Sequence, residues 1–467
     1  MEAKLEVLRP RVSRMRQAGV LSALALLFAS SLAGQSYRGS IRGVVQDPTG
    51  AAIPEASVVA KNTATGEARR ATTRDDGAYL IPELPAGRYE LTMEAKGFLR
   101  ETRSAIVAVG ADTTVDLVMT VGGDRIAVTV AATPALVDAA RDALGQVVEN
   151  RLVTQLPLNG RDFGKLVALT PGVTVEGSGV AGTEKGFGQF NINGNRDRSN
   201  NYTVDGTDNN DPFFNNSALN QVGITGAPAS LLPIDAIQEF NLEAQFGAEY
   251  GRNTGSVVNV LTKSGTNQFH GSAFEYLRNS ALDARNFFNP APNPKTAFRN
   301  NQFGGSLGGP IVHDRTLFFI AYEGQRERVG SDFNLLVPSP QAIAQAKQVA
   351  LSTPHSPITA INPALDKVLS FFPGPASVDP NTLVGTTPFA VRDKNDLDSF
   401  LAKLDHQFSA SESLSGRYVI SRSSQVYPLG SVGGFGSGSR LEQFAQLSPT
   451  RVQVLSLSLL PLPMLRG

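Results

Sequence analysis

The chain has 467 residues, more than one hydrophobic core usually organises, so at least two domains are expected. Its 42 lysine and arginine residues balance 42 aspartate and glutamate residues, and this zero net charge argues against nucleic acid as a partner. Cysteine is absent, which excludes disulfides, cysteine-ligated metal centres and thiol catalysis, while 45 glycines among many strand-forming residues favour a mainly β fold.

Residues 1–33 have the features of a secretory signal peptide. Basic residues precede an apolar run from Val20 to Leu32, and the small residues Ser31 and Ala33 suit a signal peptidase. An uncleaved membrane anchor is the alternative, but the run is shorter than the roughly 20 residues that a spanning helix needs. We therefore expect export through a signal peptide that is cleaved after Ala33.

Residues 37–121 alternate apolar and polar residues in short runs separated by turn residues. Tyr89, Leu91, Met93 and Ala95 share one face of such a run. Turns rich in Asp, Pro and Gly separate the runs at regular spacing, which predicts a β-sandwich of about seven strands. The strands are expected at residues 39–45, 56–61, 72–74, 79–81, 89–95 and 113–119.

The same region resembles the carboxypeptidase regulatory-like domain, a prealbumin-like β-sandwich. The resemblance rests on Gly43, Asp47, Gly50, Pro54 and Ala56, followed by TTRDDGAYLIPELPAGRYELTMEAKGF. Despite that family name, none of the chain's four histidines lies in a zinc-binding pattern. The adjacent acids at positions 75 and 76 precede a glycine and are expected to form a turn rather than a general acid and base. Binding of glycan or protein by the sandwich surface stays open.

Residues 122–135 are a predicted linker with a short β-prone segment, and residues 136–267 are predicted to form an α+β unit. The segment Tyr202-Thr-Val-Asp205 should be a strand that stops at Gly206, where a positive φ is available. The acidic and amide residues from Asp205 to Asp211 could bind calcium, but they lack the spacing of an EF-hand loop, and a solvated turn is favoured.

Residues 268–467 contain predicted strands, each of which has one face suited to an apolar environment and one face suited to a polar environment. Phe400, Leu404 and Phe408 share a face, Lys403 and Asp405 lie on the other, and Leu401 is an exception. The other strands are expected at residues 268–278, 316–323, 414–421 and 452–459. Residues 338–391 are expected to form an external loop with a short helix near residues 342–351.

The number of these strands is small for a closed transmembrane barrel. About five are predicted after residue 267, whereas large transport barrels close with about 22. The chain also ends in a proline-containing segment, Leu460-Pro-Leu-Pro-Met-Leu-Arg-Gly467, without a terminal aromatic residue. We therefore expect a truncated or frameshifted product that holds only the first barrel strands.

Four segments resemble the Oar-like group of TonB-dependent outer-membrane receptors. They are LPLNGRDFGKLVALTPGV (156–173), FNINGNRDRSNNYTVDGTDNND (190–211), AEYGRNTGSVVNVLTKSGTNQFHGSAFEYLRNSALDARNFF (from Ala248) and RNNQFGGSLGGPIVHDRTLFFIAYEGQRER (from Arg299). The resemblance implies a plug domain at 136–267, with Tyr202, Asp205 and Gly206 as a structural plug motif, and an incomplete antiparallel transmembrane β-barrel at 268–467. It also implies an outer-membrane location in a Gram-negative-type cell.

The resemblance gives the linker a second interpretation. In such receptors this position often holds a TonB box, which pairs edgewise with the TonB-type energy-coupling protein, and Ile126, Val128 and Val130 would present one face for that pairing. The alternative is an ordinary strand that continues the sandwich. The residues themselves favour neither interpretation.

Two functions follow from these expectations. The first is uptake of an unidentified extracellular ligand by a TonB-dependent outer-membrane receptor, of which this chain is the N-terminal portion. The second is a non-transporting periplasmic or surface binding or adhesion module made of the sandwich and the plug, directed at carbohydrate or protein. No catalytic, cofactor-binding or metal-ligating residues are expected in either case, and an enzyme is not expected.

Overall fold

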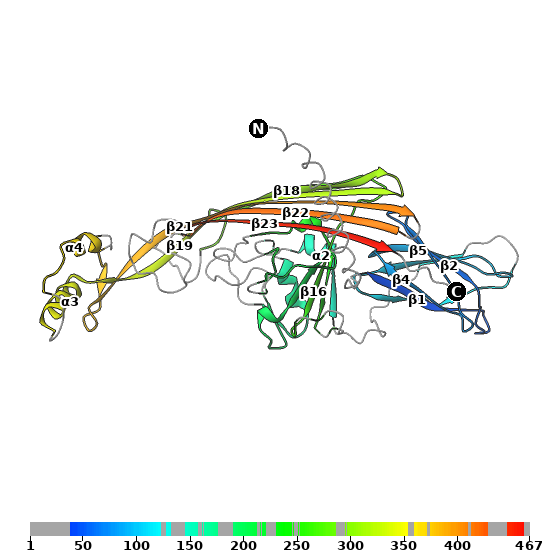
Figure 1. Ribbon diagram of the computed structural model, residues 1–467, viewed down its shortest axis with the longest axis horizontal. Coiled ribbons are helices and arrows are strands. Elements are labelled where there is room, and N and C mark those ends of the chain that lie inside the picture. Colours follow the sequence, from blue (N-terminus) through cyan, green and yellow to red (C-terminus); the bar gives the residue numbers. More distant parts are fainter. Residues whose placement is uncertain are drawn as a thin grey trace, which may run out of the picture.

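The computed structural model describes residues 38–122, 128–131, 145–156, 161, 163–175, 190–212, 215, 217–220, 230–244, 246, 251, 253–285, 295, 297–353, 359–370, 374–409, 412–427 and 446–461. The fold is mainly β, as predicted, and comprises a β-sandwich, a central region with a mixed sheet and a long curved sheet (Figure 1). We call the central region the plug region, after its predicted role. The predicted signal peptide at residues 1–33 lies outside the described residues. Within the described part of the chain, no helix combines the length and the apolar character needed to cross a membrane.

Two sheets form the sandwich. One has the strand order β4-β1-β7, with β8 also paired to β1, and the other has the order β3-β2-β5-β6-β9. The strands are β1 (Gly39–Gln46), β2 (Ser57–Asn62), β3 (Ala68–Thr72), β4 (Ala78–Leu84), β5 (Gly87–Glu94), β6 (Glu101–Val107), β7 (Asp112–Thr114), β8 (Leu117–Val118) and β9 (Val128–Ala131).

Alternation along β5 decides which side chains form the sandwich core. Tyr89, Leu91 and Met93 are fully buried in one hydrophobic cluster, whereas Glu90 between them is exposed. Ala95 packs against the same cluster, so the predicted apolar face is confirmed. Because apolar side chains from both sheets meet here, burial of this face stabilises the two-layer arrangement.

The sandwich differs from the prediction at three places. The predicted strand 113–119 is divided into β7 and β8, which each pair with β1. The predicted strand 72–74 is displaced, since β3 ends at Thr72 and the buried Thr73 instead joins two backbone segments. Its hydroxyl donates to the Ile53 carbonyl at 2.7 Å and accepts from the Ala56 amide at 2.8 Å. Strand β6 was not predicted because its mostly polar sequence, ETRSAIV, lacks a clear apolar alternation.

The plug region is built around one mixed sheet with the order β10-β15-β16-β13-β14. Its outer strands are short, while β15 and β16 are almost completely buried, which explains their nearly continuous apolar and amide sequences. The elements of this region are β10 (Gly145–Glu149), α2 (Asn150–Gln155), η2 (Phe163–Leu169), β11 (Val173–Val175), β12 (Phe190–Ile192), η3 (Asp197–Ser199), β13 (Asn201–Val204), β14 (Thr207–Asp208), η4 (Ile234–Ala236), β15 (Ile237–Glu243) and β16 (Val257–Thr262).

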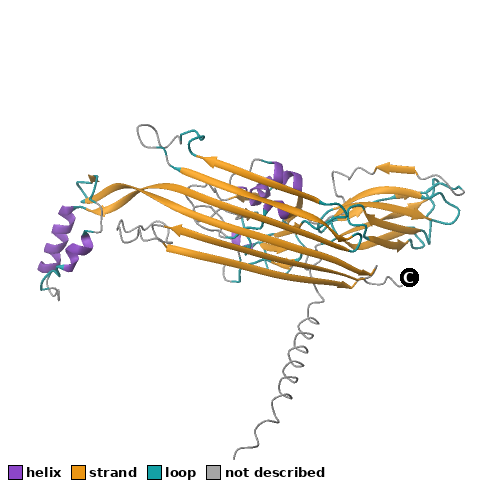
Figure 2. Cartoon of the chain, turned by 90° about the horizontal axis from the view of Figure 1, so that it is seen from above, coloured by secondary structure: helices purple, strands orange, loops and turns teal. Residues whose placement is uncertain are grey.

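The third part is a seven-stranded antiparallel sheet with the order β17-β18-β19-β21-β22-β23, to which β20 adds beside β21. Figure 2 shows its long strands running nearly parallel to the long axis of the molecule. The elements are β17 (His270–Asn279), β18 (Phe298–Val312), β19 (Thr316–Pro338), α3 (Pro340–Ser352), α4 (Ala364–Leu369), β20 (Ser377–Val378), β21 (Val384–Ser409), β22 (Glu412–Tyr427) and β23 (Gln446–Pro461).

Strands β19 and β21 are longer than predicted and form a two-stranded arm beyond the rest of the sheet. Their pairing continues from Thr316–His406 to Pro338–Val384, and helices α3 and α4 lie at the tip of the arm (Figure 1). The expected loop from residue 338 to residue 391 is therefore shorter at its C-terminal end, although the predicted helix near residues 342–351 is confirmed by α3.

Strand β18 was missed as a strand because glycine interrupts its apolar pattern. The structure explains those glycines: a Cβ at Gly309 would come within 2.4 Å of the Phe269 ring, and one at Gly304 within 2.2 Å of the Tyr322 carbonyl oxygen. Neighbouring aromatic rings and backbone occupy the space that side chains of β18 would need. Glycine at these positions permits close packing rather than ending the strand.

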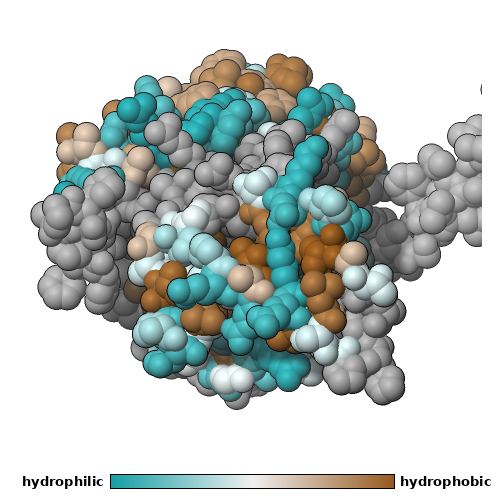
Figure 3. Space-filling view, turned by 90° about the vertical axis from the view of Figure 1, so that its left-hand side faces the viewer, coloured by the Kyte–Doolittle hydropathy of each residue, from teal (hydrophilic) through white to brown (hydrophobic). Residues whose placement is uncertain are grey.

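The curved sheet buries one face against the plug region and exposes the other. Leu401, Phe319 and Val419 are fully buried in the cluster that also holds plug residues, which explains why Leu401 departs from the polar character of its face. Phe400 and Leu404 point the other way and are 37% and 46% exposed. In an end-on view, hydrophobic residues lie at the top of the molecule, the side on which Figure 1 places the curved sheet (Figure 3).

We predict that Leu91→Ala destabilises the sandwich by about 2–5 kcal/mol, because it leaves a cavity in a close-packed core. Hydrogen exchange of the β2 and β5 amides in the full chain measures this change. Leu80→Ala is the matched control, since Leu80 lies on β4 but is 45% exposed, and it should change amide protection little. Equal losses of protection in the two variants would contradict the assigned core.

Candidate functional site between the plug and the curved sheet

The predicted plug motif lies where β13 ends. Tyr202 is buried on β13 and makes an edge-to-face contact with Phe190, with the ring centroids 6.2 Å apart. Asp205 and Gly206 follow the strand with φ values of 47° and 72°. The chain thus turns sharply at the expected position, and the turn directs the Asp205 carboxylate toward the inner face of the curved sheet.

Asp205 joins the plug to two strands of the curved sheet. Its Oδ2 atom lies 2.5 Å from Nη1 of Arg417 on β22 and 3.7 Å from Nζ of Lys403 on β21. From β16, Thr262 donates its backbone N–H to Oδ1 at 2.8 Å and its hydroxyl to Oδ2 at 2.6 Å. We refer to Asp205, Thr262, Lys403 and Arg417 as the Asp205 cluster.

The Asp205 cluster is closed to solvent, with exposures of 8% for Asp205, 7% for Lys403 and 3% for Arg417. Burial by itself would raise the pKa of the Asp205 carboxyl, but Lys403, Arg417 and the hydrogen bonds from Thr262 bring that pKa below its ordinary value. Asp205 is therefore ionised at neutral pH, and the expectation of a solvated turn is wrong for this residue.

A second charged contact joins the plug to the sheet through Arg161. Its Nε atom lies 3.6 Å from Oε1 of Glu323 on β19, whose other carboxylate oxygen accepts the Ile234 backbone N–H at 3.0 Å. The Arg161 guanidinium also lies 4.4 Å from the ring centroids of Phe274 and Tyr276 on β17. Glu323 is fully buried, so the positive charge of Arg161 compensates a carboxylate that would otherwise be costly.

The backbone of Arg161 has a φ of 53°, which is uncommon for a residue with a Cβ atom. The left-handed conformation places its side chain between Glu323 and the two aromatic rings of β17. Since such conformations persist only where the surroundings require them, the geometry is consistent with a positioning role in plug docking.

Polar contacts continue along the same interface. Leu231 donates its backbone N–H to the Ser421 hydroxyl at 3.2 Å, and its carbonyl accepts a hydrogen bond from the Ser399 hydroxyl. Thr207 of the plug lies 2.5 Å from Ser456 on β23, measured between hydroxyl oxygens. Hydrogen bonds and ion pairs thus hold the plug to the sheet in addition to the hydrophobic cluster that the two share.

The segment interpreted either as a TonB box or as a strand that continues the sandwich is described in part. Val128 and Val130 lie in β9, which pairs in parallel with β6 at the end of a sandwich sheet, and Ile126 lies outside the described residues. In this conformation the segment continues the sandwich. Among the described strands β9 pairs with β6 alone, so it is the end strand of that sheet.

Sequence reasoning found two of the four residues of the Asp205 cluster. Asp205 was identified as part of a plug motif and Lys403 was placed on the polar face of its strand, but nothing in the sequence joined them. Arg161 and Glu323 were not identified. The only sequence signal for these residues was a charged residue on the inward face of a predicted strand. Its partner could not be predicted, because contacts between residues about 200 positions apart depend on how the sheet curves.

The described residues contain no group of three or more His, Asp or Glu side chains arranged to hold a metal ion. Asp205, the residue that opens the candidate calcium-binding run, is instead compensated by two cations. A buried carboxylate with cationic partners has no remaining charge for a divalent ion.

Comparison with known proteins gives two family matches. Residues 261–458 match the family described as outer membrane beta barrel domain, and residues 40–120 match the carboxypeptidase regulatory-like domain. The chain is 30% identical over 325 residues to the TonB-dependent transporter Oar of Myxococcus xanthus, and the alignment covers 66% of this chain and 28% of that protein. These matches confirm the resemblance drawn from the sequence motifs.

Two receptors are among the solved structures to which this chain shows a low similarity. The siderophore receptor PirA from Acinetobacter baumannii has a TM-score of 0.41 and 16% identity, with 67% of this chain and 37% of that chain covered. A mutant of the ferric enterobactin receptor PfeA from Pseudomonas aeruginosa has a TM-score of 0.40 and 13% identity, with coverage of 67% and 38%.

We predict that Asp205→Asn accelerates hydrogen exchange at the Thr262 amide by about 100-fold, because Lys403 and Arg417 would be buried without a counter-charge. Asp208→Asn is the matched control, since Asp208 lies three residues away but is exposed. Exchange in the control should stay near that of the unmodified chain. Equal exchange rates at Thr262 in all three proteins would show that the cluster does not hold the plug.

The Asp205 cluster should also make plug docking depend on pH. Because the pKa of Asp205 is lower in the folded protein than in the unfolded chain, its stabilisation is complete above a pH of about 4. It is lost as the pH falls through the lowered value. Denaturant unfolding of the full chain should therefore show a stability difference between the unmodified chain and Asp205→Asn at pH 7 that shrinks at pH 3. A difference that is constant with pH would contradict this assignment.

Proposed function

We propose that this chain is the N-terminal portion of an outer-membrane receptor that takes up an extracellular ligand. The chain is a homologue of the TonB-dependent transporter Oar and contains matches to an outer-membrane β-barrel domain and a carboxypeptidase regulatory-like domain. The match to the outer membrane beta barrel domain and the homology to Oar indicate an outer-membrane location. The chain spans about a quarter of the length of that relative. The ligand is unidentified.

The interface between the plug and the curved sheet carries the proposal. A transport receptor needs a plug that closes its lumen at rest and yields when force is applied from the periplasm. The Asp205 cluster and the Arg161–Glu323 pair fix the plug by directional, charged contacts whose partners lie on four different strands of the sheet, β17, β19, β21 and β22. Displacement of the plug would break these contacts and would also separate Phe319, Leu401 and Val419 from the plug side of their shared hydrophobic cluster.

We propose the same domain boundaries that the sequence analysis predicts. Residues 1–33 would be a signal peptide, residues 37–121 the regulatory-like sandwich, residues 122–135 a linker with the TonB box, residues 136–267 the plug and residues 268–467 the N-terminal part of the barrel. Tyr202, Asp205 and Gly206 would act as structural residues of the plug.

Energy would enter through the segment that contains Ile126, Val128 and Val130. We propose that this segment pairs with a TonB-type energy-coupling protein by strand addition. The position of β9 at the end of a sheet supports this role, because an end strand offers unpaired backbone groups to an additional strand. Its contact with β6 is short, four residues, and its release would cost few hydrogen bonds.

Because the chain contains no cysteine, a single introduced cysteine reports contacts unambiguously. We predict that Val128→Cys in the full chain forms a disulfide with single-cysteine variants of the periplasmic domain of a TonB-type protein. Val118→Cys is the matched control, since Val118 is a valine on the exposed side of β8 and should not cross-link. Adding a proline at residue 130 to the Val128→Cys variant should abolish the cross-link by removing a backbone donor.

Equal cross-linking at the two positions would reject strand addition at this segment. Cross-linking at neither position would favour the non-transporting binding module over the receptor.

A further inference from the structure

The outward face of the curved sheet changes from apolar to charged along its strands. On β19 the outward residues Phe318, Ile320 and Tyr322 are followed by Gly324, Arg326 and Arg328, and the inward residues between them are buried. On β21 the outward stretch from Phe408 to Phe400 is apolar except for His406 and corresponds to roughly 27 Å of strand. This length is comparable to the apolar band of about 25 Å that faces lipid in transmembrane barrels.

The charged stretch lies at the end of the strands nearer the arm, away from the sandwich. Strands β19 and β21 continue from it into the arm that carries α3 and α4, whereas their other ends meet the turn next to the sandwich (Figure 1). At the sandwich end, β18 is joined to β19 and β21 to β22 by short turns, and transmembrane barrels place their short turns on the periplasmic side. This orientation puts the charged stretch at the level of the outer-leaflet headgroups.

Register places three cations in one row across the sheet. Arg299 on β18 pairs directly with Arg328 on β19, and Arg328 pairs directly with Lys394 on β21. Like charges at directly opposed positions of an antiparallel sheet repel one another. A row of this kind is stabilised when an anion lies over it.

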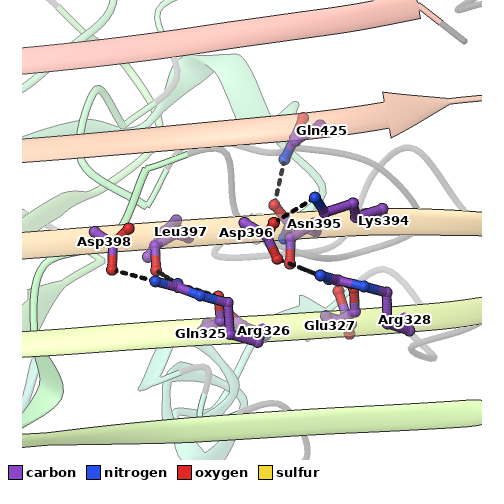
Figure 4. A network of polar contacts seen from close by, with 10 residues as sticks. All are labelled: Gln325, Arg326, Glu327, Arg328, Lys394, Asn395, Asp396, Leu397, Asp398 and Gln425. Carbon is purple, nitrogen blue, oxygen red and sulfur yellow. Dashed lines mark hydrogen bonds and ion pairs between the residues drawn. The ribbon is translucent and has the colours of Figure 1, made fainter.

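Acidic neighbours neutralise only some of the cations. Figure 4 shows Arg326 joined to Asp398, and Arg328 and Lys394 joined to Asp396, at 2.7–2.9 Å. Over the charged stretch of β17, β18, β19, β21 and β22, the outward charged residues whose side chains the structure describes are the cations Arg299, Arg326, Arg328, Lys394 and Arg422 and the acids Glu275, Asp396 and Asp398. With five positive and three negative charges, the set carries a net charge of +2.

Two exposed members of this set, Arg299 and Arg422, form no ion pair with the residues the structure describes. Arg422 stands opposite Asp398 in the register, but the Asp398 carboxylate is paired with Arg326. They lie on β18 and β22, on either side of the paired residues of β19 and β21. Both guanidinium groups are therefore available to an external anion. Guanidinium groups bind phosphate through two parallel hydrogen bonds, which a planar fork of donors favours.

We propose that these five cations, the arginine belt, bind the phosphate groups of a phosphorylated glycolipid in the outer leaflet. The acyl chains of that lipid would lie against the apolar rows of Phe318, Ile320, Phe400 and Leu404, and its phosphates would lie over Arg299 and Arg422. The belt and the apolar rows next to it thus fit a ligand that has both acyl chains and anionic phosphate groups. The proposal depends on the outer-membrane location and not on uptake of a ligand.

The test measures lipid binding by the detergent-solubilised full chain. Native mass spectrometry follows the titration with diphosphorylated lipid A, with the same lipid after enzymatic removal of both phosphates, and with inorganic phosphate. The unmodified chain should bind the diphosphorylated lipid, bind the dephosphorylated lipid much less and bind inorganic phosphate negligibly. Binding should also weaken as salt concentration rises.

The double substitution Arg299→Gln with Arg422→Gln should weaken binding of the diphosphorylated lipid by about 30-fold, since each arginine near an anionic surface contributes about 1 kcal/mol. Arg70→Gln with Arg74→Gln is the matched control, because it removes two exposed arginines from the sandwich. The control should bind lipid as the unmodified chain does. Arg299→Lys with Arg422→Lys should retain most of the affinity, because it keeps both charges.

Unchanged binding after the double glutamine substitution would overturn the proposal, as would an equal loss in the sandwich control. Equal binding of the dephosphorylated lipid would overturn it as well, because the phosphates would then contribute nothing. Binding of inorganic phosphate with comparable affinity would reassign the belt to a free anion. Exchange at the Thr262 amide reports whether each variant keeps its fold, and failure of lipid binding leaves the cross-linking result of Val128→Cys unaffected.

Discussion

The contact between Asp205 and the two cations of the curved sheet is the interaction on which the arrangement of plug and sheet depends. A carboxylate can be buried only where positive charge and hydrogen bonds replace its water. Arg417 and Lys403 provide the charge from adjacent strands, and Thr262 provides two donors from within the plug. Since four strands must be in register for this to occur, the cluster fixes the orientation of the plug.

The same constraint divides the curved sheet into two environments. Its inward face carries polar residues such as Lys403, Ser421 and Glu323 where the plug presents polar partners, and apolar residues such as Leu401 where the plug presents its hydrophobic core. Its outward face carries apolar residues over the stretch that meets lipid and charged residues beyond it. On one strand, the inward residues therefore match the plug, whereas the outward residues match the environment outside the sheet.

The strands and helices that were predicted correctly are those with a clear local sequence pattern. Strands with clear alternation, such as β5 and β21, were predicted with the correct faces, and the predicted helix of the arm is present. Strand β18 was missed because its glycines make room for aromatic rings from other strands, which a local pattern does not contain. The lengths of the arm strands β19 and β21 were underestimated, because these strands pair mainly with each other beyond the rest of the sheet.

The sequence by itself determined the mainly β class, the motifs that connect the chain with the Oar-like group, and the alternation that separates the two faces of each long strand. These features depend on residues close together in the chain. Only the tertiary structure decided that Asp205 meets Arg417 and Lys403, that Arg161 meets Glu323, and that Arg299, Arg328 and Lys394 form one row. Each of these contacts depends on strand register and sheet curvature, which bring together residues that are distant in sequence and have no local signal for one another.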